Sequence, residues 1–118
     1  MNQIAQITGS EEVIVLLTLQ FKPGTAEKVL ASVVPSIQPT RAEAGNNEFQ
    51  VFKVKGSADK VVIFERWKSQ AALEAHWKLS YTQEALALFK EYLVEPLSDT
   101  KDVIYLVDMM KPGRPELN

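Results

Sequence analysis

The 118-residue sequence contains no cysteine. This absence excludes disulfides, thiolate catalysis, iron–sulfur clusters and cysteine-based zinc sites, and it is consistent with a reducing compartment. Histidine is almost absent as well, because His76 is the single one. One imidazole cannot supply a multi-histidine metal site, so we expect no metal ion.

The sequence also lacks a large excess of one charge and a long apolar run. Thirteen basic and 15 acidic side chains give a net charge of −2, which provides no general attraction for nucleic acid or for an anionic membrane. No stretch is apolar for long enough to cross a bilayer, and residues 1–12 lack the features of a secretory signal. We therefore expect a cytoplasmic protein that binds neither nucleic acid nor membrane.

Glycine-rich phosphate-binding loops, the Walker lysine motif and the dinucleotide fingerprint are all missing from the sequence. Pairs of metal-ligating side chains at helical spacing are missing too. These absences predict that the protein uses no cofactor.

Strands and helices are indicated by two different periodicities. Runs of β-branched and apolar residues predict strands at residues 13–20, 49–54, 61–67 and 103–107. Apolar residues at helical spacing predict helices that begin near Thr25, Ser69 and Ser80. The two middle strands are separated by Gly56 and a few polar residues, so they should form an antiparallel hairpin.

Helix ends are predicted from individual residues. We expect the Thr25, Ser69 and Ser80 side chains to cap the helices that follow them, the last in a capping-box sequence. Pro35 is unfavourable within a helix, so the first helix should kink or end near residue 34. The segment after it should close at Gly45 and the two asparagines that follow, since these residues tolerate the left-handed conformation.

The order strand, helix, strand, strand, helix pair, strand is typical of the α+β, ferredoxin-like fold with a four-stranded antiparallel sheet. In the third strand, residues 61–67, large apolar side chains alternate onto both faces. Helices cover only one face of such a sheet, so the other would leave a large apolar patch in a monomer. We therefore predict a homodimer with sheet packed on sheet. The domain should span residues 13–108, between an extension at 1–12 and a tail at 109–118.

Three segments resemble the antibiotic biosynthesis monooxygenase family of dimeric α+β barrels. They are Phe21-Lys22-Pro23-Gly24, Arg41-Ala42-Glu43-Ala44-Gly45 and, most specifically, Glu65-Arg66-Trp67-Lys68-Ser69-Gln70-Ala71-Ala72-Leu73-Glu74-Ala75-His76. The resemblance covers about residues 13–108 and implies a pocket between the sheet and the helices. Members of this family include cofactor-free oxygenases of quinols or polycyclic phenols, and haem-degrading enzymes.

The haem-degrading branch typically uses an asparagine in its first strand and a histidine in its last helix. Residues 13–20 contain no asparagine and residues 81–93 contain no histidine. Both differences argue against haem.

Three residues are candidates for catalysis. His76 can act as a general base near neutral pH, or it can simply pack against the helix that bears it. Trp67 and Tyr81 could contact a flat ring and donate hydrogen bonds, although tryptophan is also a common core residue.

Three further residues are candidates for substrate binding. Glu65 lies on an otherwise apolar strand face, so its carboxyl must be paired, solvated or neutralised. It could move a proton, or it could be a structural hydrogen-bond acceptor. Trp77 and Phe89 could line an aromatic pocket, and aromatic residues at helical spacing are otherwise core residues.

The favoured function is the cofactor-independent oxidation of a quinol or polycyclic phenol by molecular oxygen. The alternative is a non-catalytic protein that binds a small aromatic ligand on the same dimeric scaffold. An RNA-recognition domain has the same order of elements, but residues 61–67 lack the glycine and the basic start of its strand motif.

Overall fold

The computed structural model describes residues 11–110, so most of the predicted extension and tail lies outside the described residues. The elements are β1 (Val13–Gln20), α2 (Ala26–Val33), a 3₁₀ turn η1 (Val34–Ser36), α3 (Ile37–Arg41), β2 (Asn46–Lys53), β3 (Lys60–Trp67), α4 (Gln70–Trp77), α5 (Ser80–Tyr92) and β4 (Val103–Leu106). No helix within this range is long and apolar enough to cross a bilayer.

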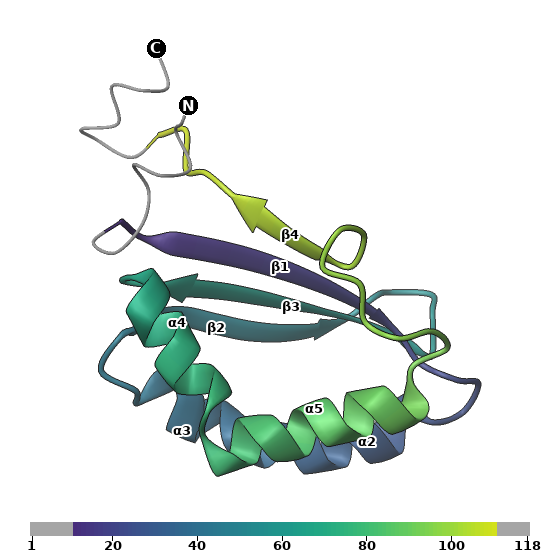
Figure 1. The fold of residues 1–118 in the computed structure, drawn as a ribbon. Helices are drawn as coiled ribbons and strands as arrows, with labels where there is room; N and C mark the ends of the chain where they lie inside the picture. The colour runs from purple at the N-terminus through teal and green to yellow at the C-terminus, as the bar shows by residue number, and fades with distance from the viewer. Residues whose placement is uncertain (1–10, 111–118) are drawn as a thin grey trace.

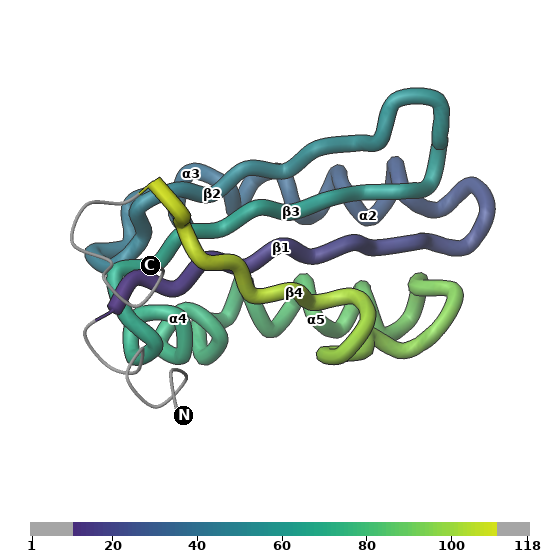
Figure 2. The backbone as a smooth tube through the Cα atoms, turned by 90° about the horizontal axis from the view of Figure 1, so that it is seen from above, coloured from purple at the N-terminus to yellow at the C-terminus, as the bar shows by residue number. Residues whose placement is uncertain are grey.

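The four strands form one antiparallel sheet in the order β2-β3-β1-β4. Figure 1 shows all the helices on one face of this sheet, and Figure 2 shows α2 and α5 running side by side behind the strands. The predicted α+β, ferredoxin-like fold is thereby confirmed.

The two faces of β3 differ as the alternating sequence predicts. Val61, Ile63, Glu65 and Trp67 are buried on the helix-covered face, whereas the residues between them are only partly buried. On the open face, Arg66 pairs with three acidic side chains, those of Glu12, Glu48 and Asp108. The helix-covered face therefore holds one carboxyl group within an otherwise apolar surface.

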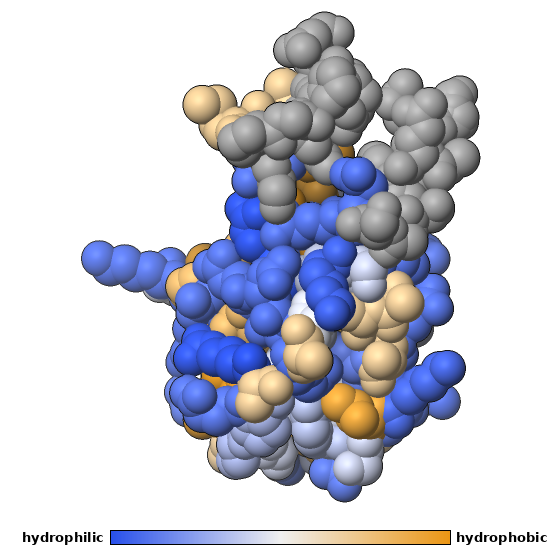
Figure 3. All heavy atoms as spheres, turned by 90° about the vertical axis from the view of Figure 1, so that its left-hand side faces the viewer, coloured by the Kyte–Doolittle hydropathy of each residue, from blue (hydrophilic) through white to orange (hydrophobic). Residues whose placement is uncertain are grey.

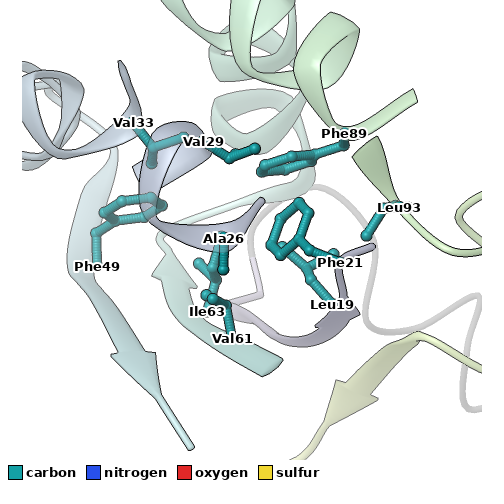
Figure 4. Packing of buried hydrophobic residues seen from close by; sticks show 10 residues of the cluster. All are labelled: Leu19, Phe21, Ala26, Val29, Val33, Phe49, Val61, Ile63, Phe89 and Leu93. Atoms are coloured by element: carbon teal, nitrogen blue, oxygen red, sulfur yellow. The ribbon is translucent and has the colours of Figure 1, made fainter. Parts of the chain in front are cut away.

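The hydrophobic core lies between the sheet and the α2–α5 pair. Figure 4 shows its ten buried side chains: Leu19, Phe21, Ala26, Val29, Val33, Phe49, Val61, Ile63, Phe89 and Leu93. The rings of Phe21 and Phe89 pack at 5.8 Å between centroids with a tilt of 59°. Trp67 belongs to a smaller second cluster with Val13, Val15 and Leu73. The site described below lies where these two clusters meet.

The prolines shape the chain after the first helix as predicted. Helix α2 ends at Val33, and Pro35 lies in the 3₁₀ turn that follows. Pro39 is the third residue of α3, where its missing N–H would have had no partner within the helix. The two prolines thus replace one long helix with two short ones.

Gly45 is needed for a different reason from the one predicted. Among residues 11–110, positive φ angles occur only at Gly24 and Gly56, so the left-handed turn expected at Gly45 is wrong. A Cβ at position 45 would instead overlap the methyl group of Ala72 on α4. The Gly45 carbonyl also accepts a hydrogen bond from the Lys68 N–H at 2.9 Å. Close packing on α4 therefore selects glycine, and β2 begins at the next residue.

The predicted helix caps were correct only in part. The Ser69 hydroxyl accepts a hydrogen bond from the Ala72 N–H, as expected. The Thr25 side chain does not cap α2, because the Asp59 carboxylate accepts hydrogen bonds from the backbone of Gly24 and Ala26. These backbone hydrogen bonds lower the pKa of Asp59.

The predicted capping box at Ser80 is also wrong. The residue that precedes helix α5 is Leu79, and no side chain caps the helix there. The Gln83 side-chain amide, which a capping box would turn toward Ser80, donates instead to the carbonyl of Trp77. This contact joins α5 to the end of α4.

Replacing Gly45 with alanine tests the close packing against α4. We expect Gly45→Ala to lower the free energy of unfolding by about 1–3 kcal/mol, since the added methyl group overpacks the contact. Ala72→Gly removes the opposing methyl group at a helix-propensity cost of about 1 kcal/mol. Chemical denaturation of both single variants and the double variant should show that Gly45→Ala costs less in the Ala72→Gly background. Strictly additive losses would contradict a direct contact.

Candidate functional site

A cavity of about 70 Å³ lies between the sheet and the helices. Its apolar walls are Leu17, Val33, Phe49, Ile63, Trp77, Ala85, Leu86 and Phe89, and its polar groups come from Ser36, Thr40, Glu65, His76, Tyr81 and Thr82. Five of the six residues predicted for the site line this cavity, namely Glu65, His76, Trp77, Tyr81 and Phe89. The fold therefore brings together residues that lie on one strand and two helices.

The imidazole of His76 is buried and held in one orientation. Its Nδ1 lies 2.8 Å from Oε2 of Glu43, whose side chain is 15% exposed. A carboxylate oxygen only accepts hydrogen bonds, so Nδ1 carries the proton of the neutral ring and Nε2 keeps a lone pair. His76 can therefore accept a proton at Nε2.

Tyr81 binds to the same carboxylate oxygen. The Tyr81 hydroxyl donates a short hydrogen bond to Oε2 of Glu43. Burial raises the pKa of Tyr81 to about 12, and the hydrogen bond to Glu43 and the charge of that carboxylate act in the same direction. The phenol thus remains a neutral hydrogen-bond donor at physiological pH.

Glu43 was not identified as a site residue from the sequence. It lies between α3 and β2, 33 residues from His76 and 38 from Tyr81. The available signal was its place in the family-like segment from Arg41 to Gly45. Thr82 was missed too, and its hydroxyl lies 3.4 Å from Nδ1 of His76.

Trp67 was predicted to contact a substrate ring, but the structure places it elsewhere. It is completely buried and is not among the residues that line the cavity. Its indole packs on the imidazole of His76, with ring centroids 4.6 Å apart and a tilt of 33°. Trp67 therefore supports His76 from within the core. Trp77, which lines the cavity and is 40% exposed, is better placed to touch a ligand.

Glu65 is a buried acid with one side-chain donor. Trp67 Nε1 donates to its Oε1 at 2.8 Å, and the residue is only 7% exposed. Burial raises the pKa of Glu65, and the hydrogen bond from Trp67 offsets part of this rise. Both readings of this residue, as a structural acceptor and as a group that holds a proton at the cavity wall, are compatible with this geometry.

The rest of the described chain offers weaker sites. Residues 11–110 contain no group of three or more acidic or histidine side chains that could hold a metal ion. A second hollow of about 240 Å³ lies beside the end of β1, and its charged groups are Glu95, Lys101 and Asp102. Lys101 is paired with Glu95, and both side chains are mainly exposed. Figure 3 shows that the end of the molecule at α4 is largely hydrophilic. The His76 cavity is therefore the candidate site.

Comparison with solved structures identifies proteins of the same fold. The structure of Rv0793 from Mycobacterium tuberculosis aligns with a TM-score of 0.74 and 24% identity, covering 86% of this chain and 99% of that one. PA3566 from Pseudomonas aeruginosa aligns with a TM-score of 0.72 and 21% identity, covering 82% and 93%. At these identities the likeness shows the fold alone.

Comparison of sequences extends this result to the family. The chain is 33% identical over 79 residues to the Bacillus subtilis protein named "Putative monooxygenase YcnE", covering 67% of this chain and 83% of that protein. The family model described as antibiotic biosynthesis monooxygenase matches residues 12–88, which include Glu43, Glu65, His76 and Tyr81. The chain therefore belongs to the antibiotic biosynthesis monooxygenase family.

Proposed function

We propose that this protein is a cofactor-independent monooxygenase that oxidises a quinol or polycyclic phenol with molecular oxygen. The observation that carries the proposal is the His76 imidazole, which Glu43 orients so that Nε2 keeps a lone pair that can accept a proton, with only the distant Thr82 hydroxyl at 3.5 Å beside it. The apolar walls around it suit an aromatic ring, and membership of the family supports the reaction class.

The reaction requires one proton acceptor and a substrate that supplies all the electrons. Nε2 of His76 takes the proton of a ring hydroxyl and leaves an electron-rich anion that reacts with oxygen. One oxygen atom forms a new C–O bond with the ring and the other leaves as water, so that a dihydroxy ring and O₂ give a hydroxyquinone and H₂O. The ring supplies the four electrons that reduce O₂. The chain needs only to bind, orient and deprotonate the substrate.

The other predicted residues have separate roles in this proposal. Tyr81 remains neutral and donates its single hydroxyl proton to Glu43, so its role is to hold the carboxylate that orients His76. Trp77 and Phe89 contact the ring of the substrate. Glu65 accepts the hydrogen bond of Trp67 and so keeps the indole packed against His76.

The size of the cavity limits how a substrate can bind. An apolar cavity of about 150 Å³ is known to take benzene, and the cavity described here has about half that volume. A ring must therefore enter with its hydroxylated edge first, and side chains at the opening must move. The partly exposed Trp77 is the natural one to move.

The proposal also includes a homodimer formed through the open sheet face. Phe52 is 52% exposed and Ile104 45%, and Phe64 and Leu16 are only partly buried in the single chain. These side chains share the face that no described helix covers. Members of the family are commonly dimeric. A cytoplasmic location stays a prediction from the composition.

Removing the proton acceptor tests the reaction. Purified protein should consume oxygen with menadiol or anthrone, and His76→Ala should lower the rate by about 10²–10⁴-fold. Glu43→Gln should lower it less, because an amide keeps the hydrogen bonds but loses the charge. Glu84→Gln, at an exposed position on α5, is the matched control and should leave the rate unchanged. Saturable binding without oxygen uptake would support the non-catalytic alternative instead.

Replacing Glu65 with glutamine tests the electrostatics of the cavity wall. Because the pKa of Glu65 is raised on folding, its neutral form contributes stability below the unfolded pKa, and this contribution is lost as the pH rises through the folded value. Glutamine is neutral throughout and can still accept from Trp67. Thermal melts should therefore show that Glu65→Gln gains more stability over the wild type at pH 8 than at pH 4. Glu84→Gln should show no such dependence, and an equal gain at both pH values would refute the prediction.

A charge on the open sheet face should break the proposed dimer. Light scattering during gel filtration should give twice the 13.2 kDa chain mass for the wild type and the single mass for Phe64→Glu. Val34→Glu is the control, since Val34 is 55% exposed and lies at the start of η1 on the helix side. A monomeric wild type, or an unchanged mass for Phe64→Glu, would rule out this interface.

A further inference from the structure

The charged groups around the cavity are all acidic apart from His76. Glu65 lies in its wall, and Glu43 lies directly behind His76 and Tyr81. No lysine or arginine is among the residues that line the cavity. An ionised ligand would therefore meet negative charge with no cation to balance it.

The arginines nearest in sequence to the two site glutamates are engaged elsewhere. Arg41 donates to the Phe49 carbonyl at 2.9 Å and to the Gln50 side chain at 3.0 Å. Arg66 points to the opposite face of the sheet, where it pairs with Glu12, Glu48 and Asp108. Neither guanidinium is available to bind a carboxylate in the cavity.

The positive end of helix α5 does not alter this balance. Tyr81 and Thr82 lie in the first turn of α5, where the helix dipole favours an anion. A side chain of this turn already binds an anion, because the Glu43 carboxylate accepts the hydrogen bond from the Tyr81 hydroxyl. A second anion would be repelled by the first.

We propose that this cavity selects its ligand by charge, binding neutral hydroxylated aromatic compounds and rejecting their carboxylated, sulfonated or phosphorylated counterparts. This inference rests on the proposed function, because it specifies the substrate class of the same site. The acidic surroundings favour a ligand that donates a hydrogen bond, and the lone pair of His76 Nε2 is a suitable acceptor for a ring hydroxyl. Glu65 is buried and already accepts a hydrogen bond from Trp67. When its carboxyl group is ionised, it has no proton to donate to an anionic ligand and repels it.

Two ligands of nearly the same shape separate charge from size. We would measure the binding of 4-hydroxy-2-naphthamide and 4-hydroxy-2-naphthoate, whose two substituents lie on the same ring, to the full chain by titration calorimetry at pH 7.5, where the acid is ionised and the phenol is not. We expect the amide to bind at least about tenfold more tightly, since charges a few ångströms apart near a protein surface interact strongly. Equal affinities, tighter binding of the carboxylate, or no binding of either compound would overturn the proposal.

Variants identify the source of the selectivity. Leu86→Lys places a cation in the cavity wall and should reduce or invert the preference, whereas the neutral control Leu86→Gln should keep it. Lys78→Gln, at an exposed position next to Trp77, should also keep it. A preference that Leu86→Lys leaves unchanged would show that the selectivity does not come from the cavity.

Binding and turnover are measured separately, so the two proposals can fail separately. A preference for the amide without oxygen uptake on menadiol or anthrone would refute the monooxygenase and leave the charge selectivity standing. Oxygen uptake that depends on His76, together with equal affinity for the two naphthalene ligands, would refute the charge selectivity and leave the monooxygenase standing.

Discussion

One oxygen atom of Glu43 connects the three segments that form the site. It accepts hydrogen bonds from His76 on α4 and from Tyr81 on α5, while Glu43 itself belongs to the segment between α3 and β2. The tautomer of His76 follows from this shared acceptor, which also adds to the effect of burial in raising the pKa of Tyr81. Without it, the imidazole would have no defined acceptor nitrogen and the Tyr81 hydroxyl would lose its hydrogen-bond acceptor.

The backbone around Glu43 is held by packing as well as by turn hydrogen bonds, from the Glu43 N–H to the Thr40 carbonyl and from the Asn46 N–H to the Glu43 carbonyl. Gly45 lies so close to Ala72 that a larger residue would push α4 away, and α4 carries His76. Trp67 packs on the imidazole and is itself held by Glu65. His76 is therefore held by the hydrogen bond to Glu43, by the indole of Trp67 and by the packing of Gly45 against the helix that carries it. A base of defined orientation requires such fixed contacts.

The two faces of the sheet carry different groups of side chains. The helix-covered face contains the cavity and the buried acid, and the open face carries the apolar side chains proposed to form the dimer. Arg66 lies on the open face and satisfies three acids there, so the positive charge of this segment is kept away from the cavity. The strict alternation of β3 thus places Arg66 on the open face and Glu65 on the helix-covered face, which leaves the cavity with an acidic character.

The fold could be predicted because it depends on short-range patterns. The period-two alternation of residues 61–67 and the prolines after Val33 act locally, and both predictions were confirmed. The family-like segment that ends at His76 contains two of the predicted residues that line the cavity, Glu65 and His76. Trp77, Tyr81 and Phe89 were predicted from the aromatic residues on the two following helices. The sequence could not show that the Trp67 indole packs behind the cavity lining, against His76, because that contact depends on how the strand and the helix pack together.

By itself the sequence determined the order of the elements, the buried face of the sheet and the single imidazole that can act as a base. Only the tertiary structure decided that Glu43 holds that imidazole, that Gly45 is small because of Ala72, and that Asp59 rather than Thr25 caps α2. The physical reason is range. Periodicity and proline act within a few residues of the chain, whereas each of these contacts joins groups at least 27 residues apart, and the register that brings them together is set by the packing of the whole core.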